Sequence, residues 1–288
     1  MVDLVTLTAG PANLVLAPEL GGAIARLDVG GVPVLRPWDG LSGNPFSLAC
    51  NPLVPFSNRM SQGGFEWRGV QHDVAPNLDG EALPIHGDGF QRAWSARSAD
   101  QIAILDLPDG SIGPWRYKAQ QTFELTDDNV CISLTVTNTS DVPLPFGLGF
   151  HPWFPRSAKT ELKFGADTVW TENNQYLPKE ELPLDLFPGW SFASSRKLPD
   201  TWINNAYTSW KGRAEINQGD GAKSCKVSAS KPLDTAIVYS PSCDADHFCF
   251  EPVSHPVDAF HLRRHPGLQE LSPGESMTSA IEISWSSE

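Results

Sequence analysis

Apolar and polar residues alternate along much of this chain, and a period of two is the pattern of a half-buried β-strand. The alternation is clearest from Trp115 to Leu125, stops at the turn signal TDDN, and restarts from Val130 to Val136. Because successive side chains of a strand point to opposite faces, each segment has one apolar and one polar face. Together they predict a long antiparallel hairpin with one face exposed to water.

Shorter runs with the same period follow one another, separated by Gly, Pro, Asn and Asp. They read AIARLDV, GFEWRGV, IAILDL, CKVSAS, TAIVY, HFCFE and AIEISW. Gly30-Gly31 predicts a two-residue hairpin turn, since glycine adopts the positive φ that such turns need. With 25 prolines and 24 glycines, no segment keeps helical spacing over three uninterrupted turns. We therefore expect an all-β protein with little helix, in which antiparallel sheets stack as a large β-sandwich.

The length of 288 residues leaves the number of domains open, because a domain usually has roughly 100–200 residues. We find no internal repeat, low-complexity tract or obvious linker. The segment from Thr171 to Asp200 is rich in proline and acidic residues and lacks clear alternation. It predicts a long surface excursion. A plain connecting loop is the commoner case, and the wall of a binding cleft is the alternative.

Charge and cysteine usage restrict the partners and the compartment. The net charge of -13 repels phosphate backbones and anionic lipid heads, so we expect neither a nucleic-acid nor a membrane partner. The five cysteines are odd in number and form no CxxC pair, which indicates free thiols in a reducing compartment. The N-terminal MVDLVTLTAG has no basic region and no long apolar run. We therefore expect a cytoplasmic protein.

Two segments in the first third of the chain carry groups suited to recognising hydroxyls. In NPLVPFSNRM, Asn58 and Arg59 present an amide beside a guanidinium with five donors. An arginine that pins a loop by bonding backbone carbonyls fits that pattern equally well. In PIHGDGFQRAW, His86 precedes a glycine pair and Phe90 supplies an aromatic face. Such faces stack on pyranose rings, although they fill cores more often.

Two further segments each place a titratable side chain before a proline, at the end of a strand-like run. They are FGLGFHPWFP with His151 and HFCFEPVSHPVDAF with Glu251. A residue before proline is driven to an extended backbone, so the direction of each side chain is well defined. Histidine exchanges protons near neutrality, since its ordinary pKa is about 6.5. A carboxylate in an apolar strand needs a partner or a shifted pKa, and a structural ion pair is the alternative to catalysis.

Other familiar sites lack their sequence patterns. Potential metal ligands crowd the segment from His247 to His265, but no HExxH or Cys/His finger spacing occurs and the prolines exclude a regular helix. We therefore predict no metal site. The chain also has no GxSxG elbow, P-loop or GxGxxG fingerprint, so serine-hydrolase and nucleotide-binding functions are not expected.

Taken together, PFSNRM, PIHGDGFQRAW, GFHPWF and FEPVSHPVDAF, followed by LSPGES, give the sequence a strong resemblance to the aldose 1-epimerase (galactose mutarotase-like) family, particularly its shorter bacterial members. The motifs occur in the family's order and span nearly the whole chain. The resemblance implies a single galactose mutarotase-like β-sandwich domain over residues 1–288, catalysis on free sugars, and no cofactor.

The resemblance also implies roles for individual residues. Glu251 would be the general base that removes the anomeric hydroxyl proton, and His151 the general acid that protonates the ring oxygen. His86 would assist them. Arg59 would bond sugar hydroxyls.

We assign the remaining sugar-binding roles to Asn58, Trp153, Phe90 and Asn204. Asn204 marks a departure, because the family usually has Asp there. Asparagine keeps an acceptor, adds donors and loses the charge. We therefore expect sugar binding with an altered hydroxyl preference.

Two other functions compete with anomer interconversion of a free aldose. A hexose-6-phosphate 1-epimerase would need Arg59 and Arg92 to converge on a phosphate. A non-catalytic carbohydrate-binding or sugar-sensing protein would use the same aromatic residues without proton transfer. The expected partner is in each case a small sugar, and the protein is a monomer or a homodimer, since exposed strand edges would permit a dimer.

Overall fold

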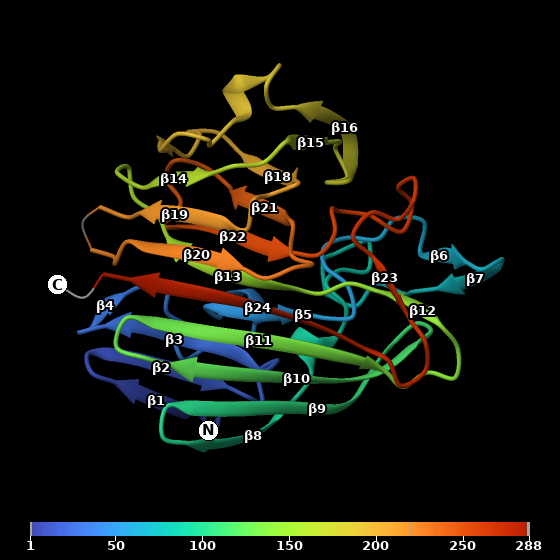
Figure 1. The fold of residues 1–288 in the computed structure, drawn as a ribbon, viewed down its shortest axis with the longest axis horizontal. Helices are drawn as coiled ribbons and strands as arrows, with labels where there is room; N and C mark the ends of the chain where they lie inside the picture. Colours follow the sequence, from blue (N-terminus) through green and yellow to red (C-terminus); the bar gives the residue numbers. More distant parts are fainter. Residues whose placement is uncertain (1, 220, 287–288) are drawn as a thin grey trace.

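Two large β-sheets lie one upon the other in the computed structural model, which describes residues 2–219 and 221–286 (Figure 1). Neighbouring strands in both sheets run antiparallel. The helical elements in the described ranges are three short 3₁₀ turns, η1 (Pro45–Ser47), η2 (Gly89–Gln91) and η3 (Pro188–Trp190). The prediction of an all-β antiparallel sandwich with little helix is confirmed.

One sheet has eleven strands and carries most of the residues singled out in the sequence. From one edge to the other its order is β1 (Val5–Ala9), β2 (Ala12–Ala17), β3 (Ala23–Val29), β5 (Cys50–Leu53), β13 (Gly149–Pro155), β22 (His247–Val253), β21 (Thr235–Ser240), β18 (Ile203–Thr208), β15 (Thr168–Glu172) and β16 (Pro178–Pro183), with β4 (Val32–Pro33) paired to β3. The central strands β13 and β22 are therefore neighbours although they are far apart in sequence.

The other sheet has nine strands. Its order is β17 (Arg196–Lys197), β14 (Glu161–Phe164), β19 (Arg213–Asn217), β20 (Cys225–Ala229), β24 (Ser276–Trp285), β11 (Asn129–Asn138), β10 (Trp115–Leu125), β9 (Ile102–Ile112) and β8 (Ser95–Ala99). Two small pairs stand apart from both sheets, β6 (Gly64–Trp67) with β7 (Val70–Asp73), and β12 (Leu144–Phe146) with β23 (Gln269–Leu271).

The two hairpins expected from the sequence are present. β10 pairs with β11 from Tyr117↔Asn138 to Leu125↔Val130, and β10 alternates almost strictly between buried and exposed residues. The second hairpin joins β3 to β4, and Val29 pairs with Val32 so that Gly30-Gly31 is the turn. Both glycines have positive φ, 58° and 82°. Only a residue without Cβ adopts this conformation readily.

The core lies between the sheets and is built from the inward faces of both. Its largest cluster includes Phe150 and Phe250 from the eleven-stranded sheet and Phe123 and Ile281 from the nine-stranded sheet. Only every second residue of β22 points into the core between the sheets, yet six of the seven residues of this strand are buried. The outer face of this strand must therefore be covered by something other than the second sheet. That cover forms the walls of the cavity described below.

The segment from Thr171 to Asp200 is more ordered than a connecting loop. It contains β16, the turn η3 and the strand β17, and it lies over one edge of the sandwich (Figure 1). Across the described ranges, the chain contains no helix with the length and apolar character that crossing a membrane requires.

Candidate active site

His151 and Glu251 face each other on adjacent strands of the eleven-stranded sheet. β13 and β22 pair in the register Gly149↔Val253 and Trp153↔Cys249, which places His151 directly opposite Glu251. The ladder is interrupted between those pairs because Pro152 and Pro252 have no N–H to donate. Both strands nevertheless continue beyond the prolines. The expectation that the two residues end their strands is therefore wrong, because each lies inside its strand.

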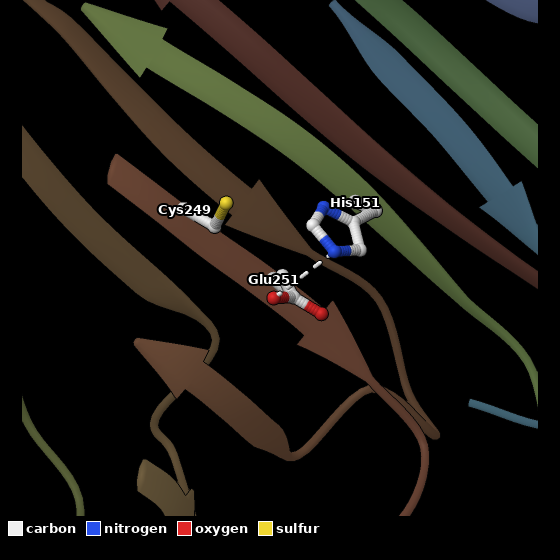
Figure 2. Close-up of side chains that lie close together, drawn as sticks. All are labelled: His151, Cys249 and Glu251. Carbon is white, nitrogen blue, oxygen red and sulfur yellow. Dashed lines mark ion pairs between the residues drawn. The ribbon is translucent and has the colours of Figure 1, made fainter. Parts of the chain in front are cut away.

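The two side chains form a buried pair (Figure 2). His151 Nε2 lies 3.4 Å from Glu251 Oε1, and the side chains are only 7% and 3% exposed. Glu251 Oε2 and His151 Nδ1 are buried without a hydrogen-bond partner. Burial raises the pKa of Glu251 from 4.5 to about 8, and burial lowers the pKa of His151 from 6.5 to about 3. Both charged forms are disfavoured because the site excludes water.

These shifts define the protonation of the pair. At neutral pH the carboxyl of Glu251 keeps its proton and the imidazole of His151 is neutral, so the pair carries one dissociable proton. Transfer of that proton across 3.4 Å converts the neutral pair into glutamate and imidazolium without exchange with solvent. A pair that can hold one proton on either member can act as acid and base in the same step.

His86 is fixed beside this pair by an unusual backbone conformation. Its φ is 59°, and its Nδ1 accepts a hydrogen bond of 2.9 Å from the backbone N–H of Asn58. The ring proton must therefore be on Nε2, and burial holds the pKa of His86 well below its ordinary value. Its ring lies edge-on to that of His151 with 5.2 Å between centroids. His86 is thus a neutral hydrogen-bond donor.

Gly87 makes this position of His86 feasible. Its φ is 67°, and a Cβ at this residue would lie 2.0 Å from the backbone oxygen of Val54. No side chain fits there. The glycine pair noted in the sequence therefore brings the loop of His86 against the strand end that leads to Asn58 and Arg59.

A cavity of about 280 Å³ opens over the pair on the outer face of the sheet. Among its lining residues are His86, His151 and Glu251, the predicted sugar-binding residues Asn58, Arg59, Trp153 and Asn204, and six residues that the sequence did not single out: Phe46, Glu81, Ile85, Tyr176, Trp202 and Tyr239. Strand pairing brings some of these residues side by side, since Asn204 on β18 pairs with Tyr239 on β21, and Tyr239 pairs in turn with Cys249 on β22. Seven of the eight predicted residues therefore meet in one place.

The eighth residue, Phe90, lies behind the wall. It is 1% exposed and stacks on Phe46, with 5.7 Å between ring centroids and an angle of 12°. Phe46 is the ring that reaches the cavity, and its centroid is 5.5 Å from that of His151. The prediction that Phe90 itself contacts the sugar is not supported by this placement. Phe90 fills the core and supports Phe46.

Trp153 forms the floor of the cavity next to His151. The two rings lie two residues apart on one face of β13 and stack with centroids 4.9 Å apart. The guanidinium of Arg36 covers the indole ring at 4.3 Å. Trp153 Nε1 is buried without a partner. His151 and Arg36 therefore hold the indole in place, and its donor is left unused.

Arg59 and Glu81, which both line the cavity, form an ion pair. Arg59 donates from Nε to Glu81 Oε2 at 3.0 Å and from Nη2 to Oε1 at 2.8 Å. The guanidinium also lies 5.0 Å from the ring of Tyr176. This two-point contact fixes Arg59 and offsets its charge. Its remaining donors are available to neutral oxygen atoms.

The opposite wall comes from the excursion after Thr171. Glu172 accepts hydrogen bonds from Trp202 Nε1 and, at 2.7 Å, from Asn204 Nδ2. Trp202 packs against Tyr176 and Tyr239, with ring centroids 5.5 Å and 5.2 Å away. The reading of this segment as a plain loop is wrong, because it supplies Tyr176 and positions Trp202 and Asn204. The lack of alternation in this segment gave no sign of that role. Trp202 and Tyr239, which lie outside the segment, complete the wall.

The arginine pair required for phosphate binding does not form. Arg92 lies outside the cavity lining, donates to the backbone oxygen of Asp109 at 3.1 Å, and approaches Asp88 at 3.8 Å. Arg59 is paired with Glu81. The positive charges of both guanidinium groups are thus directed to carboxylates or to a backbone carbonyl of the protein itself.

The crowded segment from His247 to His265 does not converge. In the described ranges, the one group of three donor side chains close enough to share a metal ion takes Cys249 and Glu251 from this segment and His151 from the neighbouring strand β13. His255 instead donates to the backbone oxygen of Pro256, and His261 pairs with Asp258. The cysteines at positions 50, 131, 225, 243 and 249 are all free thiols.

The antiparallel β-sandwich thus holds a buried carboxyl–imidazole pair in a cavity lined by aromatic rings and polar side chains. The family model for aldose 1-epimerase matches residues 3–284. The chain belongs to this family.

Similarity to known proteins extends over the full length of the chain. The chain is 33% identical to YphB of Escherichia coli, an uncharacterised protein, over 99% of this chain and 100% of YphB. A crystal structure from Escherichia coli K12, assigned provisionally as an aldose 1-epimerase, superposes with a TM-score of 0.91 at 33% identity, covering 99% and 100% of the two chains.

A galactose mutarotase-like protein from Clostridium acetobutylicum gives a TM-score of 0.84 at 17% identity, covering 100% of this chain and 96% of the other. At that identity the likeness concerns the fold. The galactose mutarotase-like sandwich implied by the sequence motifs is therefore confirmed.

Proposed function

We propose that the protein is an aldose 1-epimerase that interconverts the α and β anomers of a free, uncharged aldose. The observation that carries this proposal is the buried His151–Glu251 pair in contact with an aromatic cavity. Ring opening removes a proton from O1 and adds one to O5, and a pair that holds one dissociable proton suits that exchange. The size of the cavity, about 280 Å³, is at the lower end for small-molecule sites and suits a single sugar ring.

In the proposed cycle the proton of Glu251 first passes to His151. Glutamate then accepts the O1 proton while imidazolium gives its proton to O5, so the C1–O5 bond breaks and C1 becomes an aldehyde. Rotation about the C1–C2 bond presents the other face of the aldehyde. On reclosure His151 takes the O5 proton and Glu251 returns a proton to O1. Neither oxygen carries a full charge, and His86 donates a hydrogen bond beside the pair.

Two features support an uncharged substrate over a hexose 6-phosphate. Arg59 is paired with Glu81 and Arg92 lies outside the cavity, so the described residues offer no free guanidinium pair there to receive a phosphate. The chain as a whole carries a net charge of -13, which disfavours an anion. A cytoplasmic, reducing location fits the five free thiols and is part of the proposal.

Polarimetry on freshly dissolved sugars tests this function. The panel should contain glucose, galactose, related aldoses and their 6-phosphates, each with a blank for the spontaneous reaction. We expect acceleration with at least one free aldose and much weaker acceleration with its phosphate. Equal or faster rates with phosphates would favour the phosphate epimerase. Tight sugar binding with no acceleration across the panel would favour a non-catalytic sugar-binding protein.

The pKa values predict the pH dependence of kcat/KM. The active pair carries one proton, which it loses as the pH rises through the Glu251 pKa of about 8. It gains a second as the pH falls through the His151 pKa of about 3. We expect a plateau from about pH 4 to 7 and a tenfold loss per unit well above 8. Blank-corrected rates between pH 5 and 10 measure this, and a rise in kcat/KM above pH 8 would contradict the assignment.

Glu172 should set sugar affinity through Asn204 and Trp202. Glutamine at this position has one acceptor oxygen where the carboxylate has two, so Glu172→Gln leaves one of the two donors unpaired. We expect KM to rise about tenfold, in line with loss of one hydrogen bond to a charged group, with little change in kcat. Glu180→Gln, at an exposed residue of neighbouring β16, is the control. Loss of kcat with unchanged KM would rule out this positioning role.

A further inference from the structure

Cys249 takes no part in the proposed reaction, yet it lies beside the acid–base pair. It is two residues before Glu251 on the same face of β22 and pairs in register with Trp153. Ligand atoms of Cys249, His151 and Glu251 all lie within 4.8 Å of one another, and all three residues are buried. Figure 2 shows the sulfur, the imidazole and the carboxylate gathered over the two strands.

The chemistry of these donors is that of a zinc-type site. Thiolate and imidazole favour soft or borderline divalent ions, and three protein ligands with one open position are typical of accessible zinc centres. Nitrogen and oxygen ligands on a tetrahedral zinc ion are about 3.3 Å apart. His151 Nε2 and Glu251 Oε1 are 3.4 Å apart, so this edge of the tetrahedron already exists.

The third ligand requires only a small adjustment. Three atoms within 4.8 Å of one another leave a central point at most about 2.8 Å from each, against about 2.0–2.3 Å in a bonded zinc site. Metal binding would close this gap by a shift of the ligating side chains toward one another. Glu251 Oε2 is buried without a partner and therefore has a lone pair to offer. Burial raises the pKa of the Cys249 thiol well above its ordinary value and Arg36 opposes this shift only in part, so a bound metal ion must displace the thiol proton.

We propose that a divalent cation of the zinc class binds between His151, Cys249 and Glu251 and inhibits the protein. The ion enters from the cavity, which His151 and Glu251 line, and its open coordination position faces the sugar site. It occupies the lone pairs that the proton-transfer cycle requires, so metal and sugar turnover exclude each other. Binding itself stands apart from the proposed function, and only the inhibitory consequence rests on it.

Cobalt is the probe for binding, because a thiolate bonded to Co²⁺ gives a near-ultraviolet charge-transfer band. EDTA-treated protein titrated with Co²⁺ should develop this band up to one equivalent per chain, and Zn²⁺ should displace it. Cys249→Ser should lose the band, whereas Cys243→Ser, at an exposed cysteine, should keep it. Glu251→Gln removes a second ligand and should weaken Co²⁺ binding at least tenfold, which tests the site with an intact thiol.

Mutarotation under Zn²⁺ tests inhibition. Wild-type activity should fall in proportion to the occupied sites and return with EDTA. Cys249→Ser should keep the basal rate and need at least tenfold more Zn²⁺ for half-inhibition. Absence of the cobalt band, its persistence in Cys249→Ser, or a band with undiminished activity would each overturn the proposal. If the wild type has no mutarotase activity, the band still decides whether the metal site exists.

Discussion

Glu251→Gln should slow anomer interconversion by about 10²–10⁴-fold in kcat, the usual contribution of one positioned proton transfer. Glutamine preserves the shape of the side chain and removes its ability to accept or carry the proton. Sugar binding should survive, because the proposed hydroxyl-binding residues Arg59 and Asn204 come from other parts of the chain, Asn204 from β18 and Arg59 from the segment after β5. Progress curves for the preferred sugar, corrected for the blank, give kcat. Retention of more than a tenth of wild-type kcat would remove Glu251 from the proposed role.

The stability of Glu251→Gln is the control for its expected loss of kcat. Folding raises the pKa of Glu251 from 4.5 to about 8, so between these values the folded protein binds a proton that the unfolded chain has lost. Wild-type stability therefore falls as the pH rises through this window. Glutamine does not titrate. We expect the variant to gain stability relative to the wild type from pH 5 to 9, on the order of a few kcal/mol, as measured by urea unfolding.

His151→Asn should have an effect of similar size. The variant removes the group that receives the Glu251 proton and delivers it to O5, and it leaves an amide that neither gives nor takes a proton near neutrality. We expect a loss of about 10²–10⁴-fold in kcat. Because the two residues share one proton across 3.4 Å, they should act as a unit.

The double variant shows whether His151 and Glu251 act as one catalytic unit or as two independent groups. If His151 and Glu251 work together, His151→Asn with Glu251→Gln should cost little more than the worse single change, since either one already disables the exchange. Losses that multiply would show two independent contributions. A matched change at a nearby buried histidine outside the cavity, His255→Asn, is the control, and its kcat should stay close to that of the wild type.

The strands of the sandwich were predictable because their pattern is local. β10 and β11 show period-two alternation in sequence, and the same residues alternate in burial. Central strands such as β22 are buried on both faces, so their sequences cannot show which face meets the core. The strand pattern alone therefore did not show which residue faces Glu251, and only the family resemblance pointed to His151. The two residues are 100 positions apart, and only the order of the strands in the sheet brings them together.

The motifs located seven of the eight predicted cavity residues, but they gave no information on packing behind the wall. Phe90 and Phe46 have equivalent aromatic side chains, and only the fold decides which one lines the cavity. The opposite wall was missed because Tyr176, Trp202 and Tyr239 come from three separate segments without a shared motif. The single domain spanning residues 1–288 and the monomeric or dimeric state stay predictions.

The central claim is that the protein exchanges sugar anomers through Glu251. NMR exchange spectroscopy at anomeric equilibrium measures this directly, since it reports the interconversion rate without net reaction. At pH 6 to 7, we predict exchange cross-peaks between the α and β H1 signals of a free aldose with the wild-type protein, and none above the blank with Glu251→Gln. Equal cross-peaks with both proteins would contradict the assignment. Their absence with the wild type across the sugar panel would contradict the function.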